Sequence, residues 1–382
     1  MDLSVGIVGL PNVGKSTLFN ALLKKQQALA ANYPFATIEP NVGIVGVPDP
    51  RLAILANMVK SEDKLDNLPS LRPATVEFVD IAGLIKGASE GAGLGNKFLS
   101  HIREVSVIAH VVRVFSDDNV IREGSVNPKS DFEVINTELM LADLATLNKS
   151  LENRKIEPKK KAAIEQAVAE INNGVPVYLQ SITDEEREEL QDLFLLSNKP
   201  QIVVLNVSED QYNPEGIKRI AEEYTSVIAS KVKQSSSGDE IATSPSAPRN
   251  GSVVICAQIE SELAGLSEDE QKEYLKDLGL ESSGLERLIQ KAYQTLGLIS
   301  FLTAGEKEVR AWTIKKGSTA VQAAGEIHTD FMKKFIKAEI VGYADFVENG
   351  GWKGSREKGK ARLEGKEYVM KDGDIVEFKI GA

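Results

Sequence analysis

The sequence predicts an α/β protein built on a largely parallel sheet. Short apolar runs of strand type, at residues 3–8 and 201–205, alternate with segments of helical periodicity. The first run leads directly into Gly-Leu-Pro-Asn-Val-Gly-Lys-Ser-Thr at residues 9–17, and a helical pattern follows. This is G-x-x-x-x-G-K-S/T between a strand and a helix, which indicates a phosphate-binding loop of a Ras-like P-loop NTPase domain. A chance match in a glycine-rich turn is the alternative, and the flanking patterns argue against it.

The residue types of this loop suit the binding of phosphate and Mg²⁺. Its glycines let backbone N–H groups close around phosphate oxygens, and the following helix points its positive end at the same anion. Lys15 is expected to reach the β- and γ-phosphates, and the Ser16 hydroxyl to bind Mg²⁺. The predicted nucleotide contacts in this loop are Asn12, Val13, Gly14, Lys15, Ser16 and Thr17.

Two further motifs complete a phosphate and metal site. A strand pattern at residues 75–79 ends in Asp80-Ile81-Ala82-Gly83, so Asp80 is expected at the carboxyl end of a parallel strand, where ligands bind. An Asp there holds Mg²⁺ through water, and the backbone N–H of Gly83 would meet the γ-phosphate. Thr37 is the candidate for a second hydroxyl ligand of Mg²⁺. An ordinary Thr in a proline-bounded loop is the alternative for that residue.

The motif that would read the base departs from the guanine-specific pattern. After the strand at residues 201–205, Asn-Lys-x-Asp is replaced by Asn206-Val207-Ser208-Glu209. A carboxylate only accepts hydrogen bonds, and adenine presents an acceptor at N1 where guanine presents a donor. The Lys of the guanine-specific pattern is missing here, and the carboxylate is one methylene longer. Guanine is therefore not enforced, and ATP becomes the candidate, with Asn206, Val207 and Glu209 near the base. A second Asn-Lys pair at residues 198–199 precedes the strand, so we interpret it as a loop.

Together these motifs resemble one family, the YchF/Obg-like ATPases of the Obg branch of translation-factor P-loop proteins. Residues 257–260 match the loop that packs beside the base and sugar. The resemblance covers nearly the whole chain and rests on residues 9–17, 32–41, 47–52, 78–84, 93–99, 110–115 and 206–209.

The resemblance implies ATP preference and an association with the ribosome or its large subunit that includes rRNA contact. The position of the water-orienting Gln of many Ras-like proteins is Leu84 here, which cannot bind water. His110 is the family-matched catalytic candidate, with a core histidine as the alternative of equal weight. Asn12 is a candidate K⁺ ligand, because an Asn at this position binds K⁺ in related P-loop proteins. The cofactors expected are thus Mg²⁺ and, through Asn12, K⁺.

Composition narrows the class of protein. The net charge of −11 over 382 residues argues against a chain that coats nucleic acid. The single cysteine, Cys256, excludes an intrachain disulfide and a cysteine-based metal site. The first residues lack a basic lead, and no apolar run approaches ~18–20 residues, so we expect a cytoplasmic protein without a membrane span. The expected oligomeric state is a monomer.

Patterning also predicts a division into domains. Helical spacing at residues 131–155 and 159–172 predicts an αα-hairpin, and Thr183 with Glu186 forms a capping-box pattern. We expect a nucleotide-binding domain at 1–130 and 199–298, an inserted helical domain at 131–198, and a C-terminal domain at 299–382. The last, with one helix at about 320–337 and a final strand at 374–380, resembles a TGS domain, a ubiquitin-like β-grasp module. Patterning alone indicates only a small α+β domain there.

Basic residues are concentrated in the C-terminal part. Residues 301–382 carry 15 Lys and Arg against 13 Asp and Glu, although the whole chain is acidic. This asymmetry fits contact with RNA at a local site, and ordinary solvated surface is the alternative. The candidate contacts are Lys333, Lys334, Lys337, Lys353, Arg356, Lys358, Lys360, Arg362 and the lysines at 159–161.

Three functional hypotheses are compatible with these patterns. The favoured one is a slow ATPase stimulated by the ribosome. The second is a nucleotide-gated adaptor in which hydrolysis is incidental, and the third is an Obg-type GTPase. Turnover measured with and without ribosomes separates the first two, and the base preference separates the third.

Overall fold

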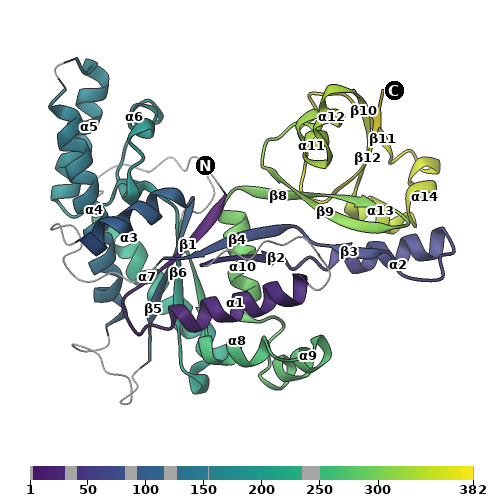
Figure 1. Cartoon of the computed structure of the whole chain (residues 1–382), viewed down its shortest axis with the longest axis horizontal. Helices are drawn as coiled ribbons and strands as arrows, with labels where there is room; N and C mark the ends of the chain where they lie inside the picture. Colours follow the sequence, from purple (N-terminus) through teal and green to yellow (C-terminus); the bar gives the residue numbers. More distant parts are fainter. Residues whose placement is uncertain are drawn as a thin grey trace. The chain divides into compact units, whose positions relative to one another are not determined.

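The computed structural model describes residues 3–30, 41–81, 93–115, 127–153, 155–234 and 250–381. The chain forms two compact units (Figure 1). The first unit comprises Met1–Val45 and Glu77–Thr295, and the second comprises Gly46–Val76 and Leu296–Ala382. Each unit has its own sheet and its own apolar core.

The first unit is built on a six-stranded sheet in the order β2-β4-β1-β5-β6-β7. The pairs β1–β4, β1–β5, β5–β6 and β6–β7 are all parallel. Strands β1, β5 and β6 are buried along their whole length, which explains why they read as continuous apolar runs. The predicted α/β class is therefore confirmed. The strands are β1 (Ser4–Val8), β2 (Val42–Gly46), β4 (Thr75–Asp80), β5 (Val107–Arg113), β6 (Gln201–Asn206) and β7 (Asn250–Ile255).

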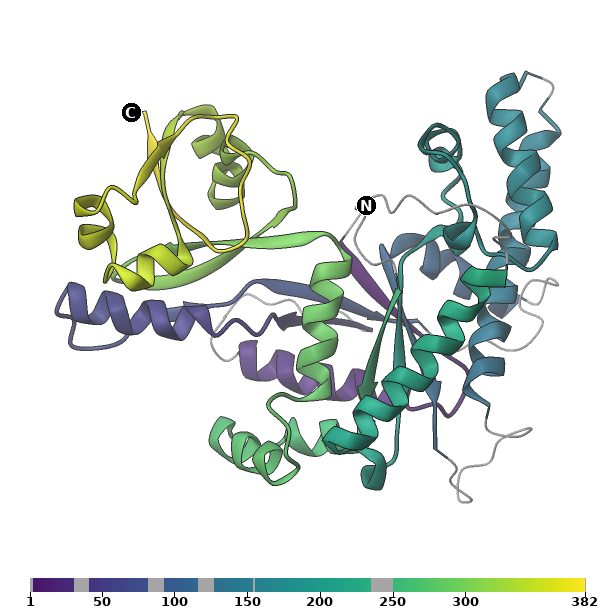
Figure 2. The same ribbon diagram turned by 180° about the vertical axis from the view of Figure 1, so that it is seen from behind.

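Helices pack on both faces of this sheet (Figures 1 and 2). One core joins α3 and α4 (Pro128–Leu151) to β1 and β5 through residues such as Ile102, Leu139 and Ile108. Another joins α7, α8 and α9 to β6 and β7 through Ile220, Ile259 and Val254. These helices are α1 (Lys15–Ala30), α3 (Gly93–Glu104), α7 (Pro214–Gln234), α8 (Ala257–Leu263), α9 (Glu268–Asp277) and α10 (Gly284–Thr295).

A helical segment separates β5 from β6, as the periodicity predicted. Helices α4 (Pro128–Leu151) and α5 (Pro158–Asn172) lie side by side in both views. They share an apolar core to which both contribute, for example through Leu147 and Ile164. Helix α4 begins earlier than predicted, because the Asn127 side chain caps it and Pro128 takes its first position. The predicted capping box is confirmed at α6 (Asp184–Leu190).

A buried carboxylate fixes α4 to the segment that leads into β6. Asp143 accepts hydrogen bonds from the backbone N–H groups of Leu196 (2.7 Å) and Ser197 (2.8 Å). Burial raises the pKa of Asp143 to about 6, while these hydrogen bonds act to lower it. Beside it, the Lys199 ammonium donates to the backbone carbonyls of Arg103 and Val105. The Asn-Lys pair at 198–199 is thus part of the connection before β6, as predicted, and lies in the core.

The second unit contains a mixed sheet in the order β11-β10-β12-β8-β9-β3. Phe301, Ala323 and Ile340 belong to the core that joins this sheet to α11. The final strand β12 agrees with its predicted bounds. The strands are β3 (Ser70–Arg72), β8 (Leu298–Ala304), β9 (Glu308–Lys315), β10 (Phe335–Gly342), β11 (Arg362–Glu364) and β12 (Asp374–Ile380). The helices are α2 (Arg51–Glu62), α11 (Ala320–Ile327), α12 (Thr329–Lys333), α13 (Tyr343–Glu348) and α14 (Trp352–Glu357).

The single helix predicted at about 320–337 was wrong. Two helices, α11 and α12, are separated at His328, whose backbone is extended and whose Nδ1 accepts a hydrogen bond from the N–H of Asp330. Strand β10 then begins at Phe335. His328 thus ends α11 and caps the start of α12, and helical periodicity alone does not reveal such a break.

Residues 46–76 pack with the second unit, although their place in the sequence predicted that they belong to the nucleotide-binding domain. Strand β3 pairs with β9 in parallel, and α2 contacts β8 and β9. Arg51 lies 2.8 Å from Asp372 in an ion pair, and Glu62 accepts from the N–H of Lys353 at 3.1 Å. These partners lie about 240 to 320 positions apart in the chain, so local patterns could not reveal them.

Among the helices that the structure describes, none is long and apolar enough to cross a membrane.

The Asp143 anchor leads to a stability prediction. Asp143→Ala should destabilise the protein by about 2–4 kcal/mol, because two buried N–H groups lose their acceptor. Urea unfolding followed by circular dichroism would show a lower midpoint. Asp143→Asn, which keeps one acceptor oxygen, should lose less. Lys149→Ala, at an exposed position of the same helix, should stay within about 0.5 kcal/mol of wild type. An unchanged midpoint for Asp143→Ala would contradict this role.

Candidate nucleotide-binding site

The segment between β1 and α1 has the geometry of a phosphate cradle. Asn12 and Gly14 adopt positive φ values of 61° and 98°. A Cβ atom at Gly14 would lie 2.3 Å from the Asn206 amide nitrogen, and one at Gly9 would lie 2.5 Å from the Val111 carbonyl oxygen. Only glycine permits this close approach of backbone. The geometry of this loop therefore agrees with the phosphate binding that its sequence predicts.

Lys15 and Asp80 are brought together beside this cradle. The Lys15 side chain is largely buried, and its ammonium donates to the Leu10 carbonyl oxygen at 2.7 Å. Burial lowers the pKa of Lys15, and the Asp80 charge raises it. For Asp80, at the end of β4, burial raises the pKa and Lys15 lowers it. The pair places a cation and a carboxylate at the carboxyl ends of adjacent strands, where phosphate and a metal would be held.

The donor set suits Mg²⁺ bound together with a nucleotide. The Ser16 and Thr17 side chains are exposed at the start of α1. Within the described ranges, no group of three or more His, Cys, Asp or Glu could hold a metal ion. The oxygens of Ser16 and Asp80 would share Mg²⁺ with phosphate oxygens and water. Thr37 and Gly83, also predicted for this shell, lie outside the described residues.

Asn206 ties the phosphate loop to the base-binding side of the cleft. Its amide nitrogen donates to the Val13 carbonyl oxygen at 2.9 Å, and its amide oxygen accepts from the Ala257 N–H at 3.0 Å. The amide nitrogen carries two hydrogens, of which the Val13 carbonyl takes one. Asn206 thus has a structural role, and the base contact stays a prediction.

A cleft of about 830 Å³ opens beside this clamp. It brings together the predicted residues Asn12, Gly14, Thr17, Asn206, Val207 and Glu209. The predicted residues Val13, Lys15 and Ser16 belong to the adjoining loop and do not line it. Helix α8 adds Ala257 and Gln258, which were predicted to lie beside the base and sugar. The unpredicted lining residues are Arg113, Phe115, Ser208, Asp210, Cys256, Ser261 and Glu262.

Arg113 and Phe115 are the most informative of the residues that sequence reasoning missed. Arg113 is buried at the end of β5, and its Nε donates to the Phe115 carbonyl oxygen at 3.0 Å. Its guanidinium carbon also lies 4.4 Å from the centre of the Phe115 ring. Both residues lie at the carboxyl end of a parallel strand, where ligands bind, and this position is the signal in the sequence that points to them.

His110 lies in the core. Its side chain is 1% exposed, and its ring stacks on Phe132 with a centroid distance of 4.9 Å. Burial lowers the pKa of His110 to about 3, with Gln201 raising it and the Lys15 charge lowering it further. The imidazole is therefore neutral at pH 7. This position gives it a packing role, and a catalytic role stays a prediction.

Comparison with known proteins gives relatives along the whole chain. The chain is 45% identical over 391 residues to the "Ribosome-binding ATPase YchF" of Bacillus subtilis (strain 168), covering 99% of each. It is 44% identical over 393 residues to the protein of that name in Escherichia coli O157:H7, again covering 99% of each. The chain belongs to the YchF family. The resemblance found from the motifs is confirmed.

Models of protein families and a solved structure agree with membership of the YchF family. Residues 4–135 match a model described as "50S ribosome-binding GTPase". Residues 298–381 match the YchF-GTPase_C model, described as a protein of unknown function. The Schizosaccharomyces pombe YchF GTPase structure superposes with a TM-score of 0.80 at 37% identity, covering 99% of this chain and 97% of that one. The two relatives are named ATPases, whereas the family model and the solved structure are named GTPases. These names therefore do not decide which base the site prefers.

The position of Lys15 leads to a prediction about turnover. Lys15→Ala should lower nucleotide hydrolysis by about 10²–10³-fold, because charge developing on the transferred phosphoryl loses its cation. Steady-state phosphate release would measure this loss. Lys25→Ala is the matched control, since Lys25 lies on the same helix, does not line the cleft, and forms a partly buried pair with Glu286. A folded Lys15→Ala protein with wild-type turnover would show that the site is assigned wrongly.

Proposed function

We propose that this chain is a Mg²⁺-dependent P-loop ATPase that hydrolyses ATP to ADP and phosphate and binds the ribosome in the cytoplasm. The observation that carries the choice of ATP is the residue set at the base side of the cleft, Asn206, Val207 and Glu209. Relatives at 45% and 44% identity bear the name ribosome-binding ATPase, which supports both the reaction and the partner.

Base preference follows from what the cleft can donate and accept. Asn206 retains one amide hydrogen for N7, which adenine and guanine share. Glu209 is exposed at the cleft, and no Lys stands between it and Asn206 to reproduce the guanine-binding pattern. A carboxylate accepts hydrogen bonds from N1–H and N2–H₂ of guanine, and it repels the N1 acceptor of adenine. Both effects require that the carboxylate is held in place beside the base edge. The longer, exposed Glu209 therefore weakens the guanine preference without excluding GTP.

Hydrolysis would rest on positioning and charge. Lys15 would contact the β- and γ-phosphate oxygens, and Ser16, Asp80 and Thr37 would hold Mg²⁺ directly or through water. The Gly83 N–H would meet the γ-phosphate. When bound, Mg²⁺ neutralises charge on the phosphate oxygens. Asn12, exposed in the loop with φ of 61°, is the proposed K⁺ ligand.

The proposed intrinsic rate is low. Leu84 has no group that orients water, and the neutral His110 is buried among core side chains. We therefore propose that ribosome binding stimulates turnover. A nucleotide-gated adaptor is the other hypothesis, and it requires equal turnover with and without ribosomes.

A titration with labelled nucleotides tests the base preference. ATP should bind about tenfold more tightly than GTP, a difference of about 1.4 kcal/mol, which one well-made hydrogen bond can supply. Both affinities should be measured at matched K⁺ and Mg²⁺ concentrations. The Glu209→Asp variant should shift the preference toward GTP. Tighter binding of GTP by the wild-type protein would favour the GTPase hypothesis, which the name of the Schizosaccharomyces pombe relative suggests for that protein.

The ribosome contact is proposed on basic surface of the second unit, whose residues 298–381 we interpret as a TGS-type β-grasp domain. The structure separates its basic residues into two groups. Arg356 is held by Glu339 at 2.8 Å and by Glu377 at 3.0 Å, and Lys360 is held by Asp345 at 2.9 Å. Lys353 and Lys358 are exposed and make no ion pair with a described residue. The second group can neutralise phosphate without breaking a pair.

The alternative ribosome contact, at Lys159–Lys161, is the weaker candidate because all three lysines already have acidic neighbours. These lysines lie near Glu185, Asp192 and Glu165 in surface ion pairs. Such pairs contribute little and exchange easily, so they do not exclude RNA contact. This site becomes the better candidate when the second unit proves not to bind.

Co-sedimentation with ribosomes over a salt series tests the contact. Changing both Lys353 and Lys358 to Gln should weaken binding and reduce the dependence of log affinity on log salt by roughly 0.7–0.9 for each phosphate that is no longer neutralised. The same change at Lys315 and Lys316, two exposed lysines of the same unit, is the matched control. Basal ATPase activity should be unchanged in both variants. Wild-type binding by the first variant at every salt concentration would remove this surface from the interface.

A further inference from the structure

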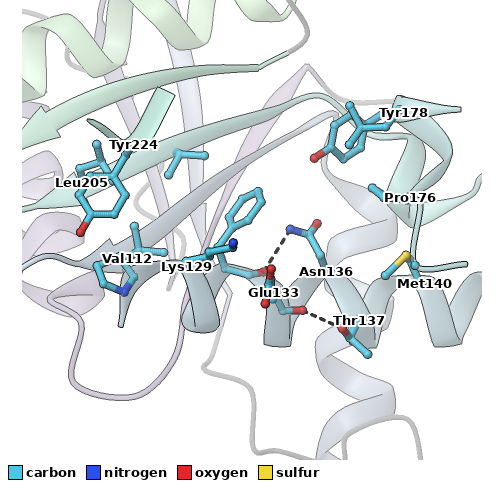
Figure 3. A pocket seen from close by; sticks show the side chains of 15 residues that line it. Val112, Lys129, Glu133, Asn136, Thr137, Met140, Pro176, Tyr178, Leu205 and Tyr224 are labelled. Atoms are coloured by element: carbon cyan, nitrogen blue, oxygen red, sulfur yellow. Dashed lines mark hydrogen bonds between the residues drawn. The ribbon is translucent and has the colours of Figure 1, made fainter. Parts of the chain in front are cut away.

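The first unit contains a second cavity, distinct from the nucleotide cleft (Figure 3). Its volume is about 70 Å³, whereas a single water needs only about 10–15 Å³ on this measure. Helix α4 forms one wall, strands β5 and β6 form another, and residues 174–179 with Tyr224 of α7 complete it. The cavity therefore can hold several heavy atoms but not the whole of an indole ring system, and it opens to solvent beside the exposed Lys129 and Thr137.

The sheet separates this cavity from the nucleotide cleft. Val112 and Leu205 line it, while the residues that follow them, Arg113 and Asn206, line the nucleotide cleft. Adjacent residues of a strand point to opposite faces. The two cavities thus lie on opposite faces of the same strand ends, and the second is not an extension of the first.

The walls of the cavity are aliphatic and aromatic. In Figure 3, Tyr224 and Leu205 lie at one end, Tyr178 and Pro176 lie at the other, and side chains of α4 lie between them. Phe132 adds a third ring, and Met140 adds a polarizable thioether. Aromatic faces and a thioether favour a flat aromatic ligand.

The polar groups at the wall do not call for a charged ligand. The Asn136 amide donates to the Phe132 carbonyl oxygen at 3.1 Å and accepts from the Gln201 amide at 2.9 Å. Lys129 and Glu133 carry opposite charges on the same turn of α4, so they cancel. A charged ligand would lose its hydration here without meeting net opposite charge.

We propose that this cavity binds one edge of an uncharged, planar aromatic molecule such as indole, the rest of which lies at the open mouth beside Lys129 and Thr137. The site is separate from the nucleotide cleft, and its occupant would rest against α4, residues 174–179 and two strands whose ends carry residues that line that cleft. A ligand of this size that is only partly buried is expected to bind with a dissociation constant on the order of 0.1–1 mM.

Methyl NMR of methionine-labelled protein tests the site directly. The chain has five methionines, and among those in the described residues Met140 alone lines the cavity. Titration with indole should shift the Met140 methyl resonance saturably, while Met58, Met332 and Met370 of the second unit stay unchanged. The Met140→Leu variant assigns the resonance. No saturable shift up to about 10 mM, tenfold above the weakest expected constant, would overturn the proposal.

Matched variants of α4 separate this cavity from nonspecific binding. Thr137 is exposed and lines the cavity, so Thr137→Trp should fill it and weaken indole binding by about tenfold or more. Leu141→Trp lies on the same helix, is exposed, and does not line the cavity, so it should bind as wild type does. Equal affinities for the two variants would contradict the assignment. Thr137→Phe serves the same purpose with a smaller ring, and thermal melts check that each variant is folded.

A comparison of indole with a charged analogue tests whether the ligand must be uncharged. Indole-3-acetate carries a carboxylate and should bind about tenfold more weakly than indole, because its charge must be desolvated. Equal or tighter binding of the anion would overturn the assignment of an uncharged ligand.

Discussion

The hydrogen bonds of one buried amide, Asn206, hold the candidate site together. They connect the phosphate loop at Val13, the end of β6 and the start of α8 at Ala257. Neighbouring strands meet at the same point, since Asn206 pairs in register with Arg113 of β5 and Ile255 of β7. Gly14 must lack a side chain because this amide occupies the space. The phosphate and base sides of the cleft therefore cannot move apart without breaking these bonds.

A second buried network extends this connection through α8. Glu260 of α8 accepts from the Tyr212 hydroxyl at 2.9 Å and from the Gly284 N–H at 2.7 Å, at the start of α10. Arg287 donates to the same hydroxyl. Burial raises the pKa of Glu260, and its hydrogen bonds lower it. A buried carboxylate is costly unless paired in this way, so the network fixes α8 against α10 and supports the Asn206 clamp from behind.

Sequence reasoning succeeded where a local rule fixes the structure. The phosphate loop, Asp80 at a strand end and the Thr183 cap depend on residues within a few positions of one another, and all were predictable. The placement of residues 46–76 in the second unit depends on partners such as Asp372, hundreds of positions away. The roles of Arg113 and the second hydrogen bond of Asn206 depend on how strands pair. No local pattern carries that information.

Charge in the second unit shows why counts of basic residues are a poor guide to a binding surface. Arg356 contacts two carboxylates and lies over the Trp352 ring at 5.3 Å. Its pKa is raised by Glu339, and that of Glu339 is lowered in return. Such an arginine orders α14 against the sheet and offers less to a phosphate than its charge suggests. Lysines whose side chains make no ion pair with a described residue, such as Lys353 and Lys358, are therefore the better candidates for phosphate contact. The fold, and not the composition, decides which lysines these are.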